Sequence, residues 1–185
     1  MKTAMLVIDV QEALCNGKYA AFEAAQVISR INAVAQLARQ NSVAVIYIQH
    51  EENGGPLEYG SDGWQLAAGL QTRSDNLYIR KSASDSFHNT NLHAMLKDLG
   101  TEHLIICGLQ SEFCVDTTIR RALALGYPVT LIADGHSTMD NEILSAAQIS
   151  AHHNVTLSNL SSFGPRVKAI PAEQIEFNPI QSRNA

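Results

Sequence analysis

A cysteine, Cys114, lies where the sequence predicts the first turn of a helix. Residues 104–107 are apolar and rich in β-branched side chains, which is typical of a buried parallel strand, and Gly108 then permits a sharp turn. We expect Ser111 to cap a helix whose apolar stripe continues to Gly126. A thiol in that first turn lies near unpaired backbone N–H groups and the positive end of the helix dipole, which favour a thiolate and suit an oxyanion. Cys114 is therefore a candidate nucleophile, although this stretch alone fits a small buried apolar residue equally well.

Two charged residues follow other predicted strands. Asp9 follows the largely apolar run at residues 3–8, which predicts a fully buried strand. Lys81 follows a short strand predicted at residues 77–79. Each has an ordinary explanation on its own, because Asp often begins a turn and Lys is usually solvated. In parallel sheets, however, ligands bind outside the carboxyl ends of the strands, where we expect Asp9, Lys81 and Cys114 to converge.

Together these residues could form a cysteine-based acyl-transfer site. A nearby lysine lowers the pKa of a thiol, and a carboxylate can accept the thiol proton. We predict that Cys114 attacks a carbonyl carbon, that Asp9 passes the proton to the leaving amine and later activates water, and that Lys81 stabilises the thiolate. The backbone N–H groups of Gln110 and Cys114 are the predicted oxyanion hole.

The segment between the second and third predicted strands is long and irregular. Residues 51–63 contain acids, glycines and a proline, and loops of this length in compact domains are commonly functional. Trp64, the only tryptophan, follows this loop and either anchors it or lines a cleft. The residues that we expect to line the substrate pocket are aromatic or polar and lie near these strand ends: His50, Trp64, Phe87, Gln110 and Phe113.

An alternation of strands and helices must position these residues. Apolar runs predict strands at residues 3–8, 43–48, 77–79, 104–107, 129–133 and 155–157. Helical patterns lie between them at residues 22–40, 92–99, 111–126 and 142–152. This order is typical of a single three-layer α/β/α domain with a six-stranded parallel sheet in a Rossmann-like order. We expect the domain to cover residues 1–164 and the proline-containing residues 165–185 to form an extended or partly mobile tail.

Composition and charge exclude several partners and cofactors. The 185 residues carry a net charge of −5 and no basic run, which argues against a nucleic-acid partner. The sequence begins with one lysine and a short apolar run that ends at Asp9, unlike a signal peptide or a membrane span, so we expect a cytoplasmic protein with no membrane partner. Cys15, Cys107 and Cys114 form no CxxC pair, which predicts thiols rather than disulfides. The seven histidines lack metal-ligand spacing, so no metal and no cofactor is predicted.

At these residues the chain resembles the isochorismatase-like cysteine hydrolases, which include nicotinamidases, N-carbamoylsarcosine amidase, streptothricin hydrolase and the isochorismatases. The resemblance extends from about residue 4 to about residue 162. It rests on Leu-Val-Ile-Asp-Val-Gln at 6–11, Lys-Ser-Ala-Ser-Asp-Ser-Phe at 81–87, Gly-Leu-Gln-Ser-Glu-Phe-Cys-Val-Asp-Thr-Thr at 108–118 and Ala-Asp at 133–134. The resemblance implies a six-stranded parallel sheet flanked by helices and a catalytic triad of Asp9, Lys81 and Cys114. It also implies a cis peptide bond between Leu109 and Gln110.

Differences within that family narrow the expected reaction. Its nicotinamidases hold a metal with an Asp and several His after the second strand, whereas this chain has only His50 there. Its isochorismatases act on a vinyl ether, and some lack the cysteine. Cys114 therefore favours hydrolysis of a C–N bond, in an amide, ureide or carbamoyl compound, through a thioester. The residues Glu112, Phe113 and Cys114 with Gln110 look closest to the streptothricin-hydrolase-like branch and to uncharacterised branches of the family. The resemblance further implies a small-molecule substrate and a homo-oligomer, either a dimer or a tetramer.

Other functions fit the same residues. An isochorismatase-type vinyl-ether hydrolase would share the fold and most of the motifs. A nucleotide-binding module would also suit a doubly wound sheet, but the sequence has neither GxGxxG nor GxxxxGK[ST]. A third possibility is a module without catalysis, which binds a small molecule or senses redox state through Cys114, although the spacing indicates no resolving cysteine.

Overall fold

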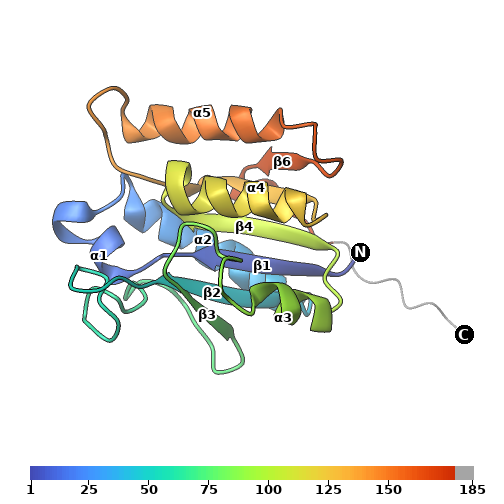
Figure 1. The fold of residues 1–185 in the computed structure, drawn as a ribbon, viewed down its shortest axis with the longest axis horizontal. Helices are drawn as coiled ribbons and strands as arrows, with labels where there is room; N and C mark the ends of the chain where they lie inside the picture. The colour runs from blue at the N-terminus through green and yellow to red at the C-terminus, as the bar shows by residue number, and fades with distance from the viewer. Residues whose placement is uncertain (178–185) are drawn as a thin grey trace, which may run out of the picture.

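The computed structural model describes residues 1–177, which form a six-stranded parallel sheet with helices on both faces (Figure 1). The strands lie in the order β3-β2-β1-β4-β5-β6. Their bounds are β1 Thr3–Ile8, β2 Ala44–His50, β3 Leu77–Lys81, β4 His103–Leu109, β5 Val129–Ser137 and β6 Val167–Ile170. The order reverses between β1 and β4, which pair with each other, so the switch point where such sheets bind ligands lies at the carboxyl ends of these two strands.

The helices form the two outer layers. α2 (Ala24–Gln40) packs on one face of the sheet, and α3 (Leu92–Asp98), α4 (Asp116–Ala124) and α5 (Ala146–Ser158) pack on the other. In Figure 1, α4 lies in front of the strands and α2 lies behind them. The shorter helical segments are α1 Glu12–Cys15, η1 Gly17–Tyr19, η2 Ser111–Val115 and η3 Ala172–Gln174. None of the helices within residues 1–177 combines the length and the apolar character needed to cross a membrane.

The packing of β1 explains its nearly continuous apolar sequence. Leu6 and Ile8 pack on the side of α3 and α4, whereas Met5 and Val7 pack on the side of α2. All four side chains are fully buried. A strand with helices on both faces has no solvent-facing side, so it shows an apolar run in place of an alternating pattern. The predicted fold class, an α/β domain with a six-stranded parallel sheet, is confirmed.

The strand predicted at residues 155–157 is wrong, because these residues form part of α5. Ser145 caps this helix: its side chain accepts a hydrogen bond from the backbone N–H of Gln148, and the Gln148 side chain accepts one from the backbone of Ser145. Leu157 is fully buried in the core, whereas Val155 is 62% exposed on the other side of the helix. Over only three residues, the apolar Val155 and Leu157 fit the composition of a short strand as well as that of a helix.

The predicted domain boundary at residue 164 is also wrong, because the sixth strand follows it. β6 pairs with β5 through Val167 and its neighbours, and Ile175 is buried on the α2 side of the sheet. Prolines flank this strand without disrupting it, since an edge strand tolerates proline near its ends. The predicted extended or mobile tail therefore does not begin at residue 165, and its part from residue 178 onward lies outside the described residues.

Candidate active site

The carboxyl end of β1 turns sharply and presents Asp9. The backbone of Asp9 lies in the left-handed region, with φ of 51°, which Asp tolerates better than most residues. Gly108 of β4 lies alongside with φ of 118°, and a Cβ atom there would clash with the carbonyl oxygen of Ile8. Only glycine therefore fits the close approach of the two strands at this point. Asp9 itself is 1% exposed despite its charge.

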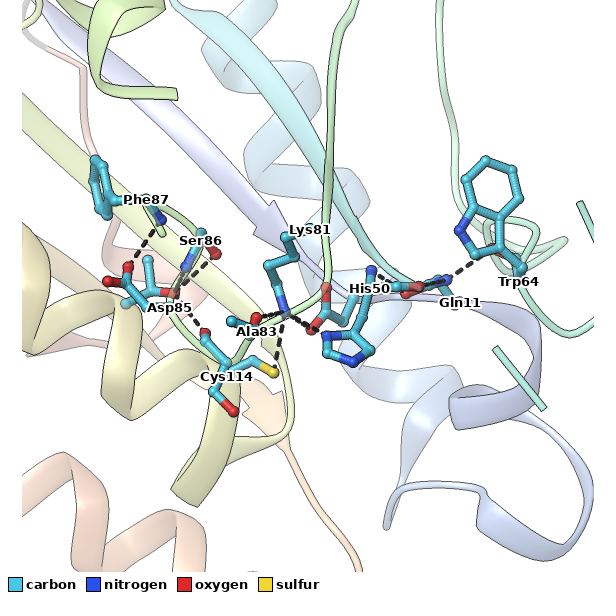
Figure 2. A network of polar contacts seen from close by, with 12 residues as sticks. Gln11, His50, Trp64, Lys81, Ala83, Asp85, Ser86, Phe87 and Cys114 are labelled. Carbon is cyan, nitrogen blue, oxygen red and sulfur yellow. Dashed lines mark hydrogen bonds and ion pairs between the residues drawn. The ribbon is translucent and has the colours of Figure 1, made fainter. Parts of the chain in front are cut away.

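The ammonium group of Lys81 lies at the centre of the site. Its Nζ donates to Asp9 Oδ2 at 2.7 Å and to the main-chain carbonyl oxygen of Ala83 at 3.0 Å. It also lies 3.1 Å from His50 Nδ1 and 3.2 Å from Cys114 Sγ. Figure 2 shows His50 and Cys114 meeting at this nitrogen. The three residues predicted as a triad, Asp9, Lys81 and Cys114, are thus brought together through Lys81.

Cys114 lies in η2, a π-helical turn that leads directly into α4. The backbone N–H of Val115 donates to the Gln110 carbonyl oxygen at 3.2 Å, the five-residue spacing that defines a π-turn. Such turns are frequent at functional sites. The peptide bond between Leu109 and Gln110 is cis, as the family resemblance predicts.

A buried polar chain lies behind this turn, and it includes Ser111. The prediction that Ser111 caps a helix is wrong, because its Oγ lies 2.7 Å from His136 Nδ1 and 3.0 Å from Ser150 Oγ. His136 Nε2 lies 3.0 Å from Asn154 Oδ1, and Asn154 Nδ2 donates to the Ala133 carbonyl oxygen at 2.8 Å. Since Asn154 Oδ1 can only accept, His136 carries its proton on Nε2 and accepts from Ser111 through Nδ1. The chain therefore joins the turn of the nucleophile to β5 and α5.

Burial and neighbouring charges set the protonation of the site. Burial lowers the pKa of Lys81, but Asp9 and Cys114 outweigh this effect and raise it overall, so Lys81 is an ammonium. Burial and the Asp9 carboxylate raise the pKa of Cys114 to about 12, against the opposite effect of Lys81. The sequence predicted a favoured thiolate, whereas in this geometry desolvation dominates and the resting nucleophile is a thiol. Burial and Lys81 lower the pKa of His50, which keeps its imidazole neutral at neutral pH.

Three of the predicted pocket-lining residues lie beside these groups. His50 contacts Lys81, Gln110 directly precedes the turn of the nucleophile, and Phe113 within that turn is 53% exposed. Next to His50 is a pocket of about 550 Å³, whose other lining residues are Glu51, Glu52, Asn53, Glu58, Tyr59 and Ser82. The roles predicted for these residues, including the oxyanion hole at Gln110 and Cys114, stay predictions.

The other two predicted lining residues lie elsewhere. Phe87 is 8% exposed and stacks on Tyr127 within the core, and its predicted role in the pocket wall stays a prediction. Trp64 contributes its main-chain carbonyl, which accepts from the side chain of Gln11, whereas its indole packs edge-on against Tyr59. Figure 2 shows this indole turned away from Cys114. Of the two roles considered for Trp64, the structure shows the anchoring of the loop.

Sequence reasoning missed Gln11, which is fully buried. Its Nε2 donates to the carbonyl oxygens of His50 at 2.9 Å and Trp64 at 2.8 Å, and its Oε1 accepts from the backbone N–H of His50 at 2.8 Å. Gln11 therefore holds the end of β2 and the loop after it against β1. The signal that could have found it is its position two residues after Asp9, where an amide can pair with the backbone of the adjacent strand.

The site also contains donor atoms that metals use. Within residues 1–177, one group of three such residues has ligand atoms within 4.8 Å of one another, namely Asp9, His50 and Cys114. Lys81 Nζ contacts all three. A cation held by these atoms would lie against a buried ammonium of the same sign, so the donor set fits Lys81 and does not fit a metal ion.

Comparisons with known proteins agree with this geometry. Residues 3–158 match the family model described as the isochorismatase domain. A streptothricin hydrolase from Streptomyces noursei is 33% identical over 176 residues, and the match covers 91% of this chain but only 64% of that protein. A ureidoacrylate amidohydrolase from Caulobacter segnis is 27% identical, with 80% of this chain and 77% of that protein covered. A crystal structure of an isochorismatase family protein is similar with a TM-score of 0.83 and 36% identity, covering 91% of this chain and 97% of the other.

Proposed function

The chain belongs to the isochorismatase family of hydrolases, and we propose that it is a cysteine hydrolase that cleaves a C–N bond of a small molecule through a thioester. The bond lies in an amide, ureide or carbamoyl group, a class to which the name of the ureidoacrylate amidohydrolase points. One observation carries the proposal: the buried Lys81 Nζ lies 2.7 Å from Asp9 Oδ2 and 3.2 Å from Cys114 Sγ. This contact gathers a nucleophile, a proton acceptor and a stabilising charge at one point.

In the first half of the proposed reaction, Cys114 is acylated. Asp9 Oδ1 has no hydrogen-bond partner within residues 1–177, so it can receive the thiol proton as Sγ attacks the carbonyl carbon. Lys81 stabilises the developing negative charge on sulfur, and the backbone N–H groups of Gln110 and Cys114 hold the oxyanion. The S–C bond forms, the C–N bond breaks, and the proton on Asp9 passes to the departing nitrogen.

In the second half, water releases the acyl group. Asp9, again a carboxylate, removes a proton from the water that attacks the thioester carbon. The C–S bond breaks, and the proton held by Asp9 returns to Cys114. The raised pKa of Cys114 makes its thiolate a strong base, which favours this return. The cycle consumes one water, and Asp9 and Cys114 carry every proton transfer in it.

The test is a panel of primary amides, ureides and carbamoyl compounds with detection of released ammonia. Cys114→Ala is expected to lose at least about a thousandfold in kcat on any compound that the wild type hydrolyses, because the covalent route is gone. Cys15→Ala is the matched control and should keep the wild-type rate, since Cys15 is buried in the core on the α2 side. Unchanged turnover in Cys114→Ala, or hydrolysis confined to a vinyl ether, would reject the proposal.

Assembly is a separate part of the proposal. The protein is proposed to form a homodimer or a homotetramer, as the resemblance to its family implies. Size-exclusion chromatography with light scattering measures the molar mass directly. A mass equal to that of one 20.1 kDa chain at micromolar concentration would reject this part without affecting the chemistry.

A further inference from the structure

The Lys81 ammonium has more acceptors than protons. Its Nζ lies within hydrogen-bond distance of Asp9 Oδ2, the Ala83 carbonyl oxygen, His50 Nδ1 and Cys114 Sγ, at 2.7, 3.0, 3.1 and 3.2 Å. An ammonium group has three N–H donors, so one of these four atoms receives no proton at any moment. The Lys81 side chain is fully buried, so these neighbours compete directly with one another.

In the resting site, the sulfur is the acceptor left out. Asp9 is charged, and the Ala83 carbonyl belongs to the main chain two residues from Lys81. We assign His50 the tautomer with its ring proton on Nε2, because Nδ1, at 3.1 Å, can then accept a hydrogen bond from Lys81, which can only donate. A protonated sulfur is the weakest acceptor of the four. While Cys114 is a thiol, Lys81 consequently donates its third N–H to His50 Nδ1.

Thiolate formation changes this balance. When Cys114 gives its proton to Asp9, the sulfur becomes an anion beside the ammonium, and a charge-assisted hydrogen bond to it becomes strong. The Lys81 N–H that was hydrogen-bonded to His50 Nδ1 must then turn toward Cys114 Sγ. The geometry points to His50 as a positioning residue that acts through Lys81: it competes with Cys114 for the third ammonium proton and so holds the nucleophile in its thiol form.

This inference rests on the proposed function for its role in catalysis. The effect itself is on the protonation of the Cys114 thiol, which can be measured without any substrate. The groups that face Cys114 are Asp9 after β1, His50 at the end of β2 and Lys81 at the end of β3. Glu52, in the loop after β2, acts on His50 by its charge. None of these neighbours other than His50 changes in the test below.

The test measures the rate of Cys114 alkylation by iodoacetamide against pH, with mass spectrometry to locate the adduct. His50→Phe keeps a ring but removes the acceptor, and is expected to lower the midpoint of the pH profile by about one unit. Alkylation at a fixed pH below the midpoint then rises about tenfold. A phenyl ring excludes water, which by itself raises the pKa of a thiol, so a lowered midpoint can come only from the released N–H.

His50→Asn is the matched variant, because its Oδ1 can accept near the position of Nδ1, and its midpoint should stay close to the wild type. Cys114→Ala measures alkylation of the two buried cysteines, Cys15 and Cys107. An unchanged or raised midpoint in His50→Phe, or an equal fall in His50→Asn, would overturn the inference. If His50→Phe does not fold, His50→Leu, which also excludes water and lacks an acceptor, takes its place with the same expected direction. The readout needs no turnover, so an absence of amidase activity would reject the proposed function and leave this inference standing.

Discussion

At the level of single residues, the site depends on a buried ion pair. The side chains of Lys81 and Asp9 are 0% and 1% exposed, so neither charge faces bulk solvent. Moving two charges out of water costs several kcal/mol, and only their mutual attraction and their hydrogen bonds offset this cost. Loss of one partner therefore leaves an uncompensated charge in the interior, which lowers the free energy of unfolding more than loss of both partners does.

Lys81→Met tests this pair, because Met has a similar length and no charge. We expect the free energy of unfolding to fall by about 3–5 kcal/mol, since Asp9 is left buried without its counter-ion. The double variant Asp9→Asn/Lys81→Met should recover part of this loss, and Asn also tolerates the left-handed backbone at position 9. Urea denaturation followed by circular dichroism measures both. A double variant less stable than Lys81→Met would contradict the explanation.

At the level of elements, neighbouring elements hold the turn that carries the nucleophile. Ser111, His136 and Asn154 join η2 to β5 and α5. Burial lowers the pKa of His136 from 6.5 to about 4. Between these two values the unfolded chain binds a proton that the folded chain does not. The contribution of neutral His136 to stability is therefore complete above about pH 6.5 and is lost as the pH falls toward 4.

His136→Gln should remove this pH dependence. Between pH 6.5 and 4, we expect the wild type to lose about 3 kcal/mol more of its free energy of unfolding than the variant does. Urea denaturation at several pH values gives the two curves. His152→Gln replaces an exposed histidine of α5 and should follow the wild type. Parallel curves for wild type and His136→Gln would show that His136 titrates equally in both states.

The contact of β1 with β4 depends on Gly108. Gly108→Ala is expected to lower the free energy of unfolding by at least about 3 kcal/mol, because its Cβ would overlap the Ile8 carbonyl and its φ of 118° is strained for alanine. Gly60→Ala is the matched control: its φ is also positive, at 82°, but no described atom lies within 4 Å of its added Cβ. The control should cost about 1 kcal/mol. Thermal unfolding measures the stability of both variants. Equal losses of stability in Gly108→Ala and Gly60→Ala would argue against a clash at Gly108.

At the level of the whole molecule, the site exists because four neighbouring strands end at one edge of the sheet. Asp9 follows β1, His50 and Lys81 end β2 and β3, and Cys114 follows β4. The strand order with its reversal at β1 and β4 brings the side chains of Asp9, His50 and Cys114 to the nitrogen of Lys81. Figure 1 shows the strands, and Figure 2 shows Lys81 with His50 and Cys114. β5 and β6 extend the other side of the sheet and complete the core.

A chain that ends at residue 164 tests whether the last strand belongs to the domain. We expect this truncation to lose several kcal/mol of folding stability or to aggregate, because it lacks β6 and the buried Ile175 and leaves the edge of β5 uncovered. Urea denaturation and size-exclusion chromatography compare it with the full chain. An identical denaturation midpoint and slope would restore the boundary predicted from the sequence.

The sequence by itself determined the fold class and the three candidate catalytic residues. Strands buried on both faces leave apolar runs, and charged residues that directly follow such runs are conspicuous, as Asp9 and Lys81 are. Parallel strands then require their carboxyl ends to share one edge. The turn that carries Cys114 could be located in the same way, because Gly108 ends its strand.

Only the tertiary structure decided which neighbours these residues have. Gln11 pairs with His50 across 39 positions of the chain, and Ser111 bonds to His136 across 25, so no local pattern could reveal either contact. Phe87 fits a pocket wall or a core equally well as a residue type, and packing alone placed it in the core. The protonation of Cys114 was likewise out of reach, because desolvation depends on how deeply the completed fold buries the sulfur.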